Sequence, residues 1–376
     1  RVEGELRGYP LHMSGQVRFE QEQWQLSGLR LSSGENRIQV NGTLAQNLDV
    51  MVEAHCPQLE ALLPEGLGQL DFSGRVNGPL GQLLLEADIA GSDLAYQGQQ
   101  LAALNGSVRL DLSGSGELTG AVTAGRWQSG SLVVLGSHLE LAGSRADHEL
   151  QIQIEQENDR LTAVVRGHLE DMAWQGGLDQ MSLSGTTLGD WQLSKPSALK
   201  IVGSGLSVAP LCLVLEHRGE VCVEGAGDFS GTGQLLARLT DVDLELVKTF
   251  TTQLDPLTGH IKGTIRAATD QGSLRSLTGK LRIPDLALMD FQKLSPRPLL
   301  NLAENEVAFD YDGKRLEARM GVGDSGQGRI QARAMLVDLD GPAAFLQAPL
   351  SGRVEMNLPD VAVFEPLTHG LFLPAG

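Results

Sequence analysis

The stretch His148-Glu-Leu-Gln-Ile-Gln-Ile154 alternates polar and apolar side chains without a slip. Successive side chains of a β-strand point to opposite faces of a sheet, so this pattern predicts a strand with one apolar and one hydrated face. The same alternation recurs along the chain, at residues 108–112, 242–246, 307–311, 330–336 and 354–358. The chain is therefore predicted to be all-β.

Turn signals separate these runs. Asn-Gly and Asp-Gly pairs, which favour two-residue hairpin turns, occur at 41–42, 77–78, 105–106, 312–313 and 340–341. Glycine is abundant, with 46 residues spread over the whole length of 376. Strands of about six to ten residues joined by such turns predict an antiparallel meander.

Helical periodicity is confined to three short segments, 58–63, 245–253 and 361–367, which we expect to cap the sheet. The sequence holds no long amphipathic helix to cover the apolar faces, so the sheet must close into a barrel, stack as a sandwich or curl into a groove. With 3 Tyr and 4 Trp, the chain lacks the aromatic girdles of an outer-membrane barrel. No domain-sized repeat with linkers indicates a sandwich. The prediction is one elongated antiparallel sheet, continuous over residues 1–376 and curled into an open groove.

Composition limits the class of ligand. The 47 acidic and 29 basic residues give a net charge of −18, and no cluster of Lys and Arg interrupts the sequence. Binding to a nucleic-acid backbone, or to anionic lipid headgroups through a basic surface, is disfavoured. Hydrophobic residues make up 41% but aromatic residues only 4%, so the apolar surface is mainly aliphatic. If the protein binds lipid, the acyl chains are expected to be the part recognised.

The chain has three cysteines. Cys212 and Cys222 lie in two short apolar strands around a turn marked by Gly219. Folding this turn about His217 brings the two cysteines opposite each other, at a distance that a disulfide bridges. Such a bond would indicate an oxidising compartment such as the periplasm. Two buried thiols are the alternative, and a zinc pair is a weaker one because the spacing is wrong.

Catalytic and metal-binding patterns were sought without success. The eight His residues show no metal-ligand spacing, and the Ser-Gly pairs are turns rather than nucleophile elbows. The Gly-rich segment 321–328 is interpreted as a hairpin tip, since no helix pattern follows it as in a phosphate-binding loop. Asp241, Asp243 and Glu245 alternate on one strand face and are interpreted as a hydrated face rather than a calcium site. We expect no enzymatic activity, no metal and no cofactor.

Three segments share an apolar pair, a break at proline or a polar residue, and then Leu-x-Gly leading into a strand. They are residues 59–76, 244–265 and 345–354. This pattern resembles the helix-to-strand signature of the AsmA-like and TamB superfamily. The order of motifs at 174–178, 188–193 and 196–199, followed by Leu-Cys-Leu and Val-Cys-Val, is similar to the central region of the TamB family. The resemblance covers the whole chain in style but only about residues 170 to 230 in motif.

The resemblance implies a β-groove that carries phospholipid acyl chains across the periplasm of a Gram-negative bacterium. The expected groove lining is the apolar phase of the alternation: Val50, Val52, Leu83, Leu85, Val108, Leu110, Leu112, Leu150, Ile152, Ile154, Ala163, Val165, Leu199, Ile201, Leu213, Val221, Val223, Ile261, Ile265, Leu281, Ile283, Val307, Phe309, Ala332, Ala334, Val354 and Met356.

The same resemblance implies partners and a location. Phospholipids are the expected ligand. TamA in the outer membrane is the expected protein partner, through regions outside this segment, and nascent outer-membrane proteins are further candidates. The sequence begins at Arg1 and holds no apolar run long enough to span a bilayer, so we expect a segment of a longer protein. The resemblance implies that this parent protein is anchored in the inner membrane.

Three functions remain open at this point. The first is a bridge-like lipid carrier. The second is an assembly scaffold or chaperone for outer-membrane proteins, which would receive strands by β-augmentation at open sheet edges. The third is a structural or adhesin-like β array with packed apolar faces. A charged residue in the lining separates them, because it would block acyl chains, leave edge pairing intact, or unfold a dry core.

Overall fold

A computed structural model describes residues 1–113, 116–130, 132–170, 173–186, 189–216, 218–248, 257–290, 297–302, 304–324, 328–337 and 349–357. The chain divides into two compact units, Arg1–Thr186 and Thr187–Gly376, here called unit 1 and unit 2. Almost all the described elements are antiparallel strands, as the alternation predicts.

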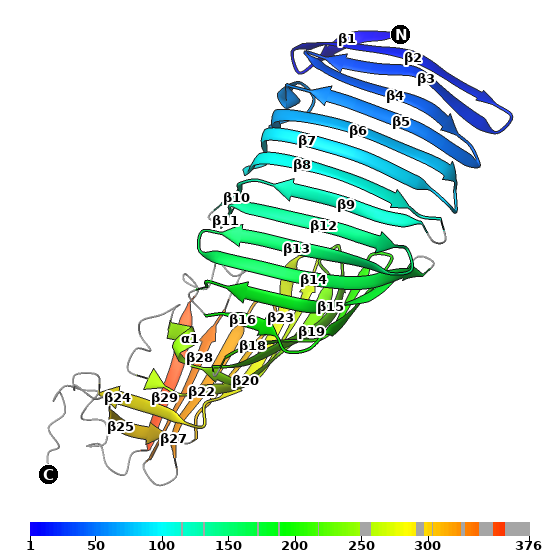
Figure 1. The fold of residues 1–376 in the computed structure, drawn as a ribbon. Coiled ribbons are helices and arrows are strands. Elements are labelled where there is room, and N and C mark those ends of the chain that lie inside the picture. The colour runs from blue at the N-terminus through cyan, green and yellow to red at the C-terminus, as the bar shows by residue number, and fades with distance from the viewer. Residues whose placement is uncertain are drawn as a thin grey trace, which may run out of the picture. The chain divides into compact units, whose positions relative to one another are not determined.

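Unit 1 is a meander in a single layer, from β1 in blue to β15 in green (Figure 1). Each strand from β2 to β8 pairs with the strands that precede and follow it in the sequence. β9 pairs with β8 and β12, and β12 to β15 then pair in sequence order. β10 and β11 form a short ribbon beside β8. The elements are β1 (Val2–Leu6), β2 (Tyr9–Glu20), β3 (Gln23–Ser33), β4 (Asn36–Leu44), β5 (Asn47–Cys56), the 3-10 helix η1 (Leu59–Ala61), β6 (Leu67–Pro79), β7 (Leu84–Tyr96), β8 (Gln99–Asp111), β9 (Glu117–Ala124), β10 (Trp127–Ser129), β11 (Leu132–Val134), β12 (Gly136–Ser144), β13 (His148–Gln156), β14 (Asp159–Glu170) and β15 (Ala173–Ser184).

Unit 2 has a main sheet and a small second one. The main sheet runs β17, β18, β19, β20, β22, β23, β26, β27, β28 and β29, with β16 beside β18, and β21, β24 and β25 form the second sheet. The elements are β16 (Trp191–Leu193), β17 (Ser197–Val202), β18 (Gly205–Leu215), β19 (Gly219–Asp228), β20 (Gly233–Asp243), α1 (Glu245–Lys248), β21 (Leu257–Thr258), β22 (His260–Asp270), β23 (Ser273–Arg282), β24 (Leu286–Asp290), β25 (Arg297–Leu302), β26 (Glu306–Tyr311), β27 (Leu316–Asp324), β28 (Gly328–Leu336) and β29 (Leu350–Asn357).

Three of the Asn-Gly pairs are not turns. The pairs at 41–42, 77–78 and 105–106 lie within β4, β6 and β8. At Gly42 the backbone has φ of +147°, and a Cβ there would clash with the carbonyl of Asp49 on β5. The glycine therefore permits close approach of two strands rather than a chain reversal. The Asp-Gly turn at 312–313 joins β26 to β27 as predicted, and the pair at 340–341 lies outside the described residues.

The alternating run at 242–246 is not one strand. β20 ends at Asp243, and α1 begins at Glu245, so the helix expected over 245–253 begins where it was predicted and is described as far as Lys248. The segment expected to be helical at 58–63 contains the single turn η1. The third, 361–367, lies outside the described residues.

The predicted disulfide is present. Cys212 of β18 and Cys222 of β19 occupy directly opposite positions in the register and are bonded. Both side chains project from the face opposite to Leu213 and Val221. The bond therefore ties two strands together without occupying the apolar face.

η1 covers one end of the apolar face in unit 1. Asn36, at the start of β4, is fully buried, and its Nδ2 donates to the carbonyls of Ser33 (3.0 Å) and Gln58 (2.7 Å). Its Oδ1 accepts from the backbone N–H of Gln58 at 3.0 Å. Ser33 Oγ also donates to the carbonyl of Ala61 at 3.3 Å. One amide side chain thus bonds three buried or partly buried backbone groups, and this fixes η1 against the end of the β3–β4 hairpin.

Unit 2 is covered at one end by a larger cap. Leu215, Val242 and Ile261 of the main sheet pack in a hydrophobic core with Leu244 and Leu246, which follow β20, and with Leu286 and Leu302 of the second sheet. Each fully buried aliphatic side chain contributes about 1.5–3 kcal/mol. The cap repeats the device of unit 1, because Asn305 is also buried and bonds the backbone of Ile283, Leu302 and Gly323.

An ion pair joins the second sheet to the main one. The Nδ1 of His260, the first residue of β22, lies 2.5 Å from Asp285 Oδ2, and its backbone N–H donates to Asp285 Oδ1 at 2.8 Å. Asp285 directly precedes β24. The hydrogen bond to Asp285 raises the pKa of His260 above its usual value, despite some opposition from burial.

Replacing Asn36 by Ala should destabilise unit 1. The change removes three hydrogen bonds to the backbone of Ser33 and Gln58, and we expect a loss of about 2–3 kcal/mol in the free energy of unfolding. Urea denaturation followed by circular dichroism measures this loss. The control is Asn105→Ala on the exposed polar face of β8, which should change stability by less than about 0.5 kcal/mol. Equal effects of the two substitutions would contradict the role of Asn36.

The stability of the cap in unit 2 should depend on pH. Because the folded state raises the pKa of His260, the pair stabilises fully below the unfolded pKa of about 6.5 and loses its contribution as pH rises through the folded value. The thermal midpoint should therefore fall between about pH 6 and pH 8. His260→Gln should remove this part of the decline, whereas His168→Gln, at an exposed position of β14, should keep it. An unchanged pH profile in His260→Gln would count against the pair.

Candidate functional site

An apolar face runs across unit 1. Residues directly opposite in neighbouring antiparallel strands share a face, so the register traces continuous rows across the sheet. One row, across β2 to β9 and β12 to β15, is Met13, Leu31, Ile38, Ala54, Phe72, Ile89, Gly106, Val122, Leu139, Ile152, Ala163 and Met181. A parallel row contains Val40, Val52, Gly74, Ala87, Val108, Gly120, Leu141, Leu150, Val165 and Leu178. These rows and their neighbours form the apolar face of unit 1.

Unit 2 has an equivalent apolar face. One row across its main sheet is Leu193, Leu213, Val221, Leu239, Gly263, Leu281, Val307, Met320, Ala332 and Val354. Another is Leu211, Val223, Ala237, Ile265, Gly279, Phe309, Ala318, Ala334 and Gly352. Both rows are aliphatic except for Phe309.

Every predicted lining residue that lies within a strand falls on the apolar face of its unit, and Leu83, Leu112 and Ile283 lie just beyond strand ends. Ile261 lies in the capped core of unit 2, and Val221, Leu281 and Ile283 pack against it. Val354 and Met356 on β29 are exposed. Whether these residues contact lipid stays a prediction.

The sequence did not identify many residues of this face. Met13, Leu31, Ile38, Ile89 and Leu139 belong to it only through the register. The period-two pattern is present around Ile38 and Val40 and could have assigned them. Ile89 lies in a strand that contains Gly and Asp at irregular positions, and pairing alone assigns it.

No second layer covers this face among the described residues of unit 1. The elements there pack against strands beside them in the sheet, apart from η1 against β6. Few hydrophobic side chains of the unit are buried, and most residues of the apolar face are half-buried. The aliphatic side chains therefore shield one another laterally and remain open above.

The apolar face is nevertheless the more enclosed side of the sheet. The exposure of alanines on the two faces shows this, because these residues all have the same side chain. On the apolar face Ala54 and Ala87 are half-buried and Ala163 is buried, whereas Ala90, Ala121 and Ala142 on the opposite face are all exposed. A flat sheet would expose both faces equally. This asymmetry is what a groove lined by the apolar face requires.

Aromatic rings on the apolar faces lie over glycines, so they do not project far from the sheet. A Cβ at Gly74 would come within 2.7 Å of the Phe72 ring, and one at Gly167 within 2.5 Å of the Trp174 ring. Phe309 covers Gly279 in the same way. The aromatic side chains fold across the neighbouring backbone instead of projecting from the sheet. The result is a smooth surface with few protrusions.

One polar pair interrupts the aliphatic face. His148 is buried, its Nε2 accepts a hydrogen bond from Trp174 Nε1 at 2.7 Å, and its Nδ1 lies 2.9 Å from the carbonyl of Ser144. An indole N–H only donates, so this geometry requires a neutral ring with its proton on Nδ1. Both ring nitrogens are used internally, so the pair offers no anchor to a ligand.

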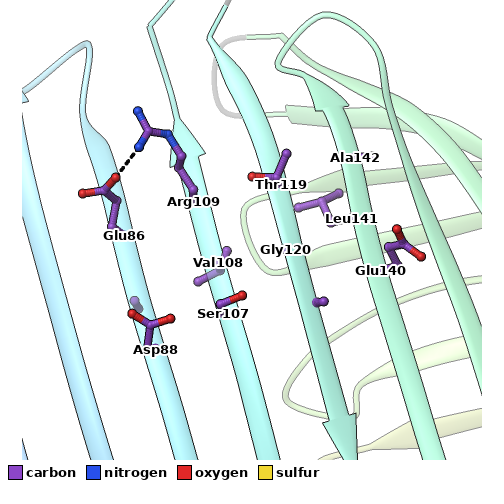
Figure 2. Close-up of a pocket in the computed structure, with 12 residues that line it drawn as sticks. Glu86, Asp88, Ser107, Val108, Arg109, Thr119, Gly120, Glu140, Leu141 and Ala142 are labelled. Atoms are coloured by element: carbon purple, nitrogen blue, oxygen red, sulfur yellow. Dashed lines mark hydrogen bonds and ion pairs between the residues drawn. The ribbon is translucent and has the colours of Figure 1, made fainter.

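The opposite face is polar and hydrated. Figure 2 shows it across β7, β8, β9 and β12, where Glu86 and Arg109 form an ion pair between two strands. Similar cross-strand pairs link Asp49 with Arg75 at 3.0 Å and Glu149 with Arg166 at 2.6 Å. A shallow hollow of about 550 Å³ lies among these side chains and includes Asp88 and Glu140. Exposed pairs of this kind contribute about 0–1 kcal/mol each, and their main effect is to keep this face in water.

The remaining sequence candidates have structural roles. Cys56 is a free, buried thiol whose pKa is raised, first by burial and then by the charge of Asp71, which suits an inert thiol rather than a nucleophile. Asp241 pairs with Lys262 at 2.9 Å and Asp243 with Arg218 at 3.3 Å. These two carboxylates are therefore used separately. The Gly-rich segment joins the paired strands β27 and β28, and residues 325–327 of its tip lie outside the described part.

Comparison with known families agrees with this geometry. The model of the family described as "TamB, N-terminal domain" matches residues 1–371. The chain belongs to the TamB family. This confirms the resemblance seen in the sequence motifs.

A curated TamB-family relative gives the same result. The translocation and assembly module subunit TamB of Haemophilus influenzae is 23% identical over 352 residues, which are 90% of this chain and 26% of the relative. The TamB-family segment thus spans about a quarter of that protein. Among the described residues of the present chain, no helix is long and apolar enough to cross a membrane.

Cysteine labelling should report the enclosure of the apolar face. In a Cys56→Ser background, Ala121→Cys should react with a charged thiol reagent at least about tenfold faster than Ala163→Cys, because burial raises the pKa of a thiol and excludes the reagent. The two positions are alanines on opposite faces of the same sheet, so neither change is large. Equal labelling rates would show that the two faces are equally open.

Proposed function

We propose that the apolar face binds the acyl chains of phospholipids and lets them pass along the sheet, as part of a bridge-like carrier in the envelope of a Gram-negative bacterium. The observation that carries the proposal is the aliphatic face of unit 1. No second layer covers it among the described residues, and it is nevertheless more enclosed than the polar face. An enclosed but uncovered apolar surface calls for an apolar ligand.

The energetics suit an acyl chain. Moving one methylene group from water to an apolar surface gains about 0.8 kcal/mol, and the rows of the apolar face continue without interruption from strand to strand. The face offers few hydrogen-bonding groups, and its one buried histidine is internally satisfied. A ligand is therefore held by burial alone and has no fixed anchor, which favours sliding over tight binding at one point.

The wider role follows from the family. The Haemophilus relative is named as a subunit of a translocation and assembly module, and we propose that this segment works in such a module in the periplasm. The parent protein would be anchored in the inner membrane and would meet TamA through regions outside this segment. The oxidised Cys212–Cys222 pair suits a compartment outside the cytoplasm.

Assembly of outer-membrane proteins by β-augmentation is the alternative. It requires an unpaired strand edge, and the strands β2 to β9 and β12 to β14 of unit 1 are paired on both sides. The interior of that sheet therefore offers no place for an added strand. The alternative would have to act at the ends of a sheet and would not use the apolar rows.

Two adjacent substitutions on β13 test the proposal. Ile152→Glu places a charge in the apolar row between Leu139 and Ala163, whereas Gln153→Glu places the same charge on the exposed polar face. The protein is purified from a bacterial periplasm without detergent, and bound phospholipid is measured by native mass spectrometry and lipid extraction. Wild type and Gln153→Glu should carry phospholipid, and Ile152→Glu should lose most of it while its circular dichroism stays unchanged.

Other results would point elsewhere. A folded wild-type chain without lipid would contradict the carrier proposal. Unfolding of Ile152→Glu alone would indicate a dry, covered core, and Leu110→Glu with its polar-face control Arg109→Glu would then repeat the comparison on β8. Unchanged lipid content in both lining variants would place the lipid on another surface.

A further inference from the structure

A cationic hollow opens on the polar face of unit 2, and its lining also includes Met320 and Ala332 of the apolar row. It has a volume of about 730 Å³ and opens over β23, β26, β27, β28 and β29. Five cationic side chains line it, Lys280, Arg319, Arg329, Arg333 and Arg353, against two anionic ones, Glu306 and Glu355. This is a local excess of positive charge in a chain whose net charge is −18.

The arginines are aligned across three strands. Arg319 of β27 lies directly opposite Arg333 of β28, which lies directly opposite Arg353 of β29. Like charges at directly opposite positions destabilise a sheet. In unit 1 the corresponding positions are complementary, since Arg109 lies opposite Glu86 and Arg166 opposite Glu149.

The described carboxylates neutralise this row only in part. Glu317 is shared by three arginines: Arg319 Nε lies 2.7 Å and Arg333 Nη2 2.8 Å from its Oε1, and Arg315 Nη2 lies 3.1 Å from its Oε2. The hydrogen bonds from Arg333 and Arg319 lower the pKa of Glu317 to about 2. Glu355 lies 2.8 Å from Arg353 Nε, Glu304 3.5 Å from Arg329 Nη1 and Glu306 2.8 Å from Lys280 Nζ. Each guanidinium has five N–H donors, and these carboxylate contacts occupy only part of them.

The hollow is open to solvent, and residues with small side chains lie at its bottom. Directly between Lys280 and Arg319 in the same row lies Ala308, and Gly321 lies beneath the guanidinium of Arg329, whose Nη2 is 3.3 Å from the position of a Cβ there. The Arg319 and Arg333 side chains are 66% and 58% exposed, so a ligand reaches them from solvent. Cations surround a space that no described side chain fills.

We propose that this hollow binds a phosphate group, presented either by a phospholipid headgroup at a membrane surface or by a soluble phosphate compound. A phosphate has three oxygens that accept from several guanidinium forks at once. Glu304, Glu306, Glu317 and Glu355 already contact the cations of the hollow, and they leave part of the guanidinium donors for a phosphate. The site opens on the polar face and does not depend on the function proposed for the apolar face.

Two substitutions with opposite signs test the site. Arg333→Gln removes the central guanidinium and should weaken binding of inorganic pyrophosphate, used as the probe in isothermal titration calorimetry at low salt, by about tenfold or more. Glu317→Gln removes the competing carboxylate and should strengthen binding. Arg166→Gln, an ion-paired arginine at an equivalent position on the polar face of unit 1, should leave it unchanged. Because Arg333→Gln also relieves like-charge repulsion, its thermal midpoint should not fall.

Vesicles distinguish the two sources of phosphate. Co-sedimentation with phosphatidylglycerol vesicles that depends on Arg333 indicates a lipid headgroup, and pyrophosphate binding without co-sedimentation indicates a soluble compound. Either result supports the site. Absence of pyrophosphate binding in the wild type, or binding that Arg333→Gln and Glu317→Gln do not change, overturns it. Binding of an acidic peptide but not of pyrophosphate overturns it as well, because the ligand would then be a protein.

Discussion

The alternation of side chains along each β-strand places every second residue on one face, and in unit 1 only η1 packs against that face among the described residues. This is an unusual way to use aliphatic side chains, since most sheets bury such a face under helices or a second sheet. Here the side chains cover each other laterally, and the comparison of Ala163 with Ala121 shows that the apolar side is still the more enclosed one. A surface of this kind is stable enough to persist and apolar enough to attract a ligand.

At one end of each unit the apolar face is covered, and the chain forms a dry core there. η1 in unit 1 and the second sheet in unit 2 each lie at one end of their unit, and in each a buried asparagine, Asn36 or Asn305, satisfies the backbone groups that this packing would otherwise leave without partners. When irregular backbone packs on an apolar surface, its N–H and C=O groups lose their hydrogen bonds to water. The chain confines that cost to one end of each unit, and no described segment covers the remaining apolar rows of unit 1.

The polar faces of the two units differ in how their charged side chains are arranged, and the amino-acid composition does not reveal this difference. In unit 1, Arg109 and Arg166 lie opposite carboxylates on the neighbouring strand. Unit 2 instead gathers Arg319, Arg333 and Arg353 into one row within an acidic protein. The net charge of −18 argued against a basic binding surface, and as a statement about the whole chain it is correct. A few residues aligned by the register nevertheless create a local field of the opposite sign.

Much of this protein could be predicted from the sequence because the period of two is a local property. The strands, the antiparallel order, the apolar phase around Ile152 and the Cys212–Cys222 bond all follow from neighbouring residues and short turns. The Asn-Gly pairs failed as turn signals, because whether a glycine reverses the chain or admits the next strand depends on that strand. Register decided the rest. The position of Ile89 in the apolar row, the three aligned arginines in the cationic hollow and the contacts of Asn36 with Gln58 join residues far apart in the sequence, and only the folded sheet brings them together.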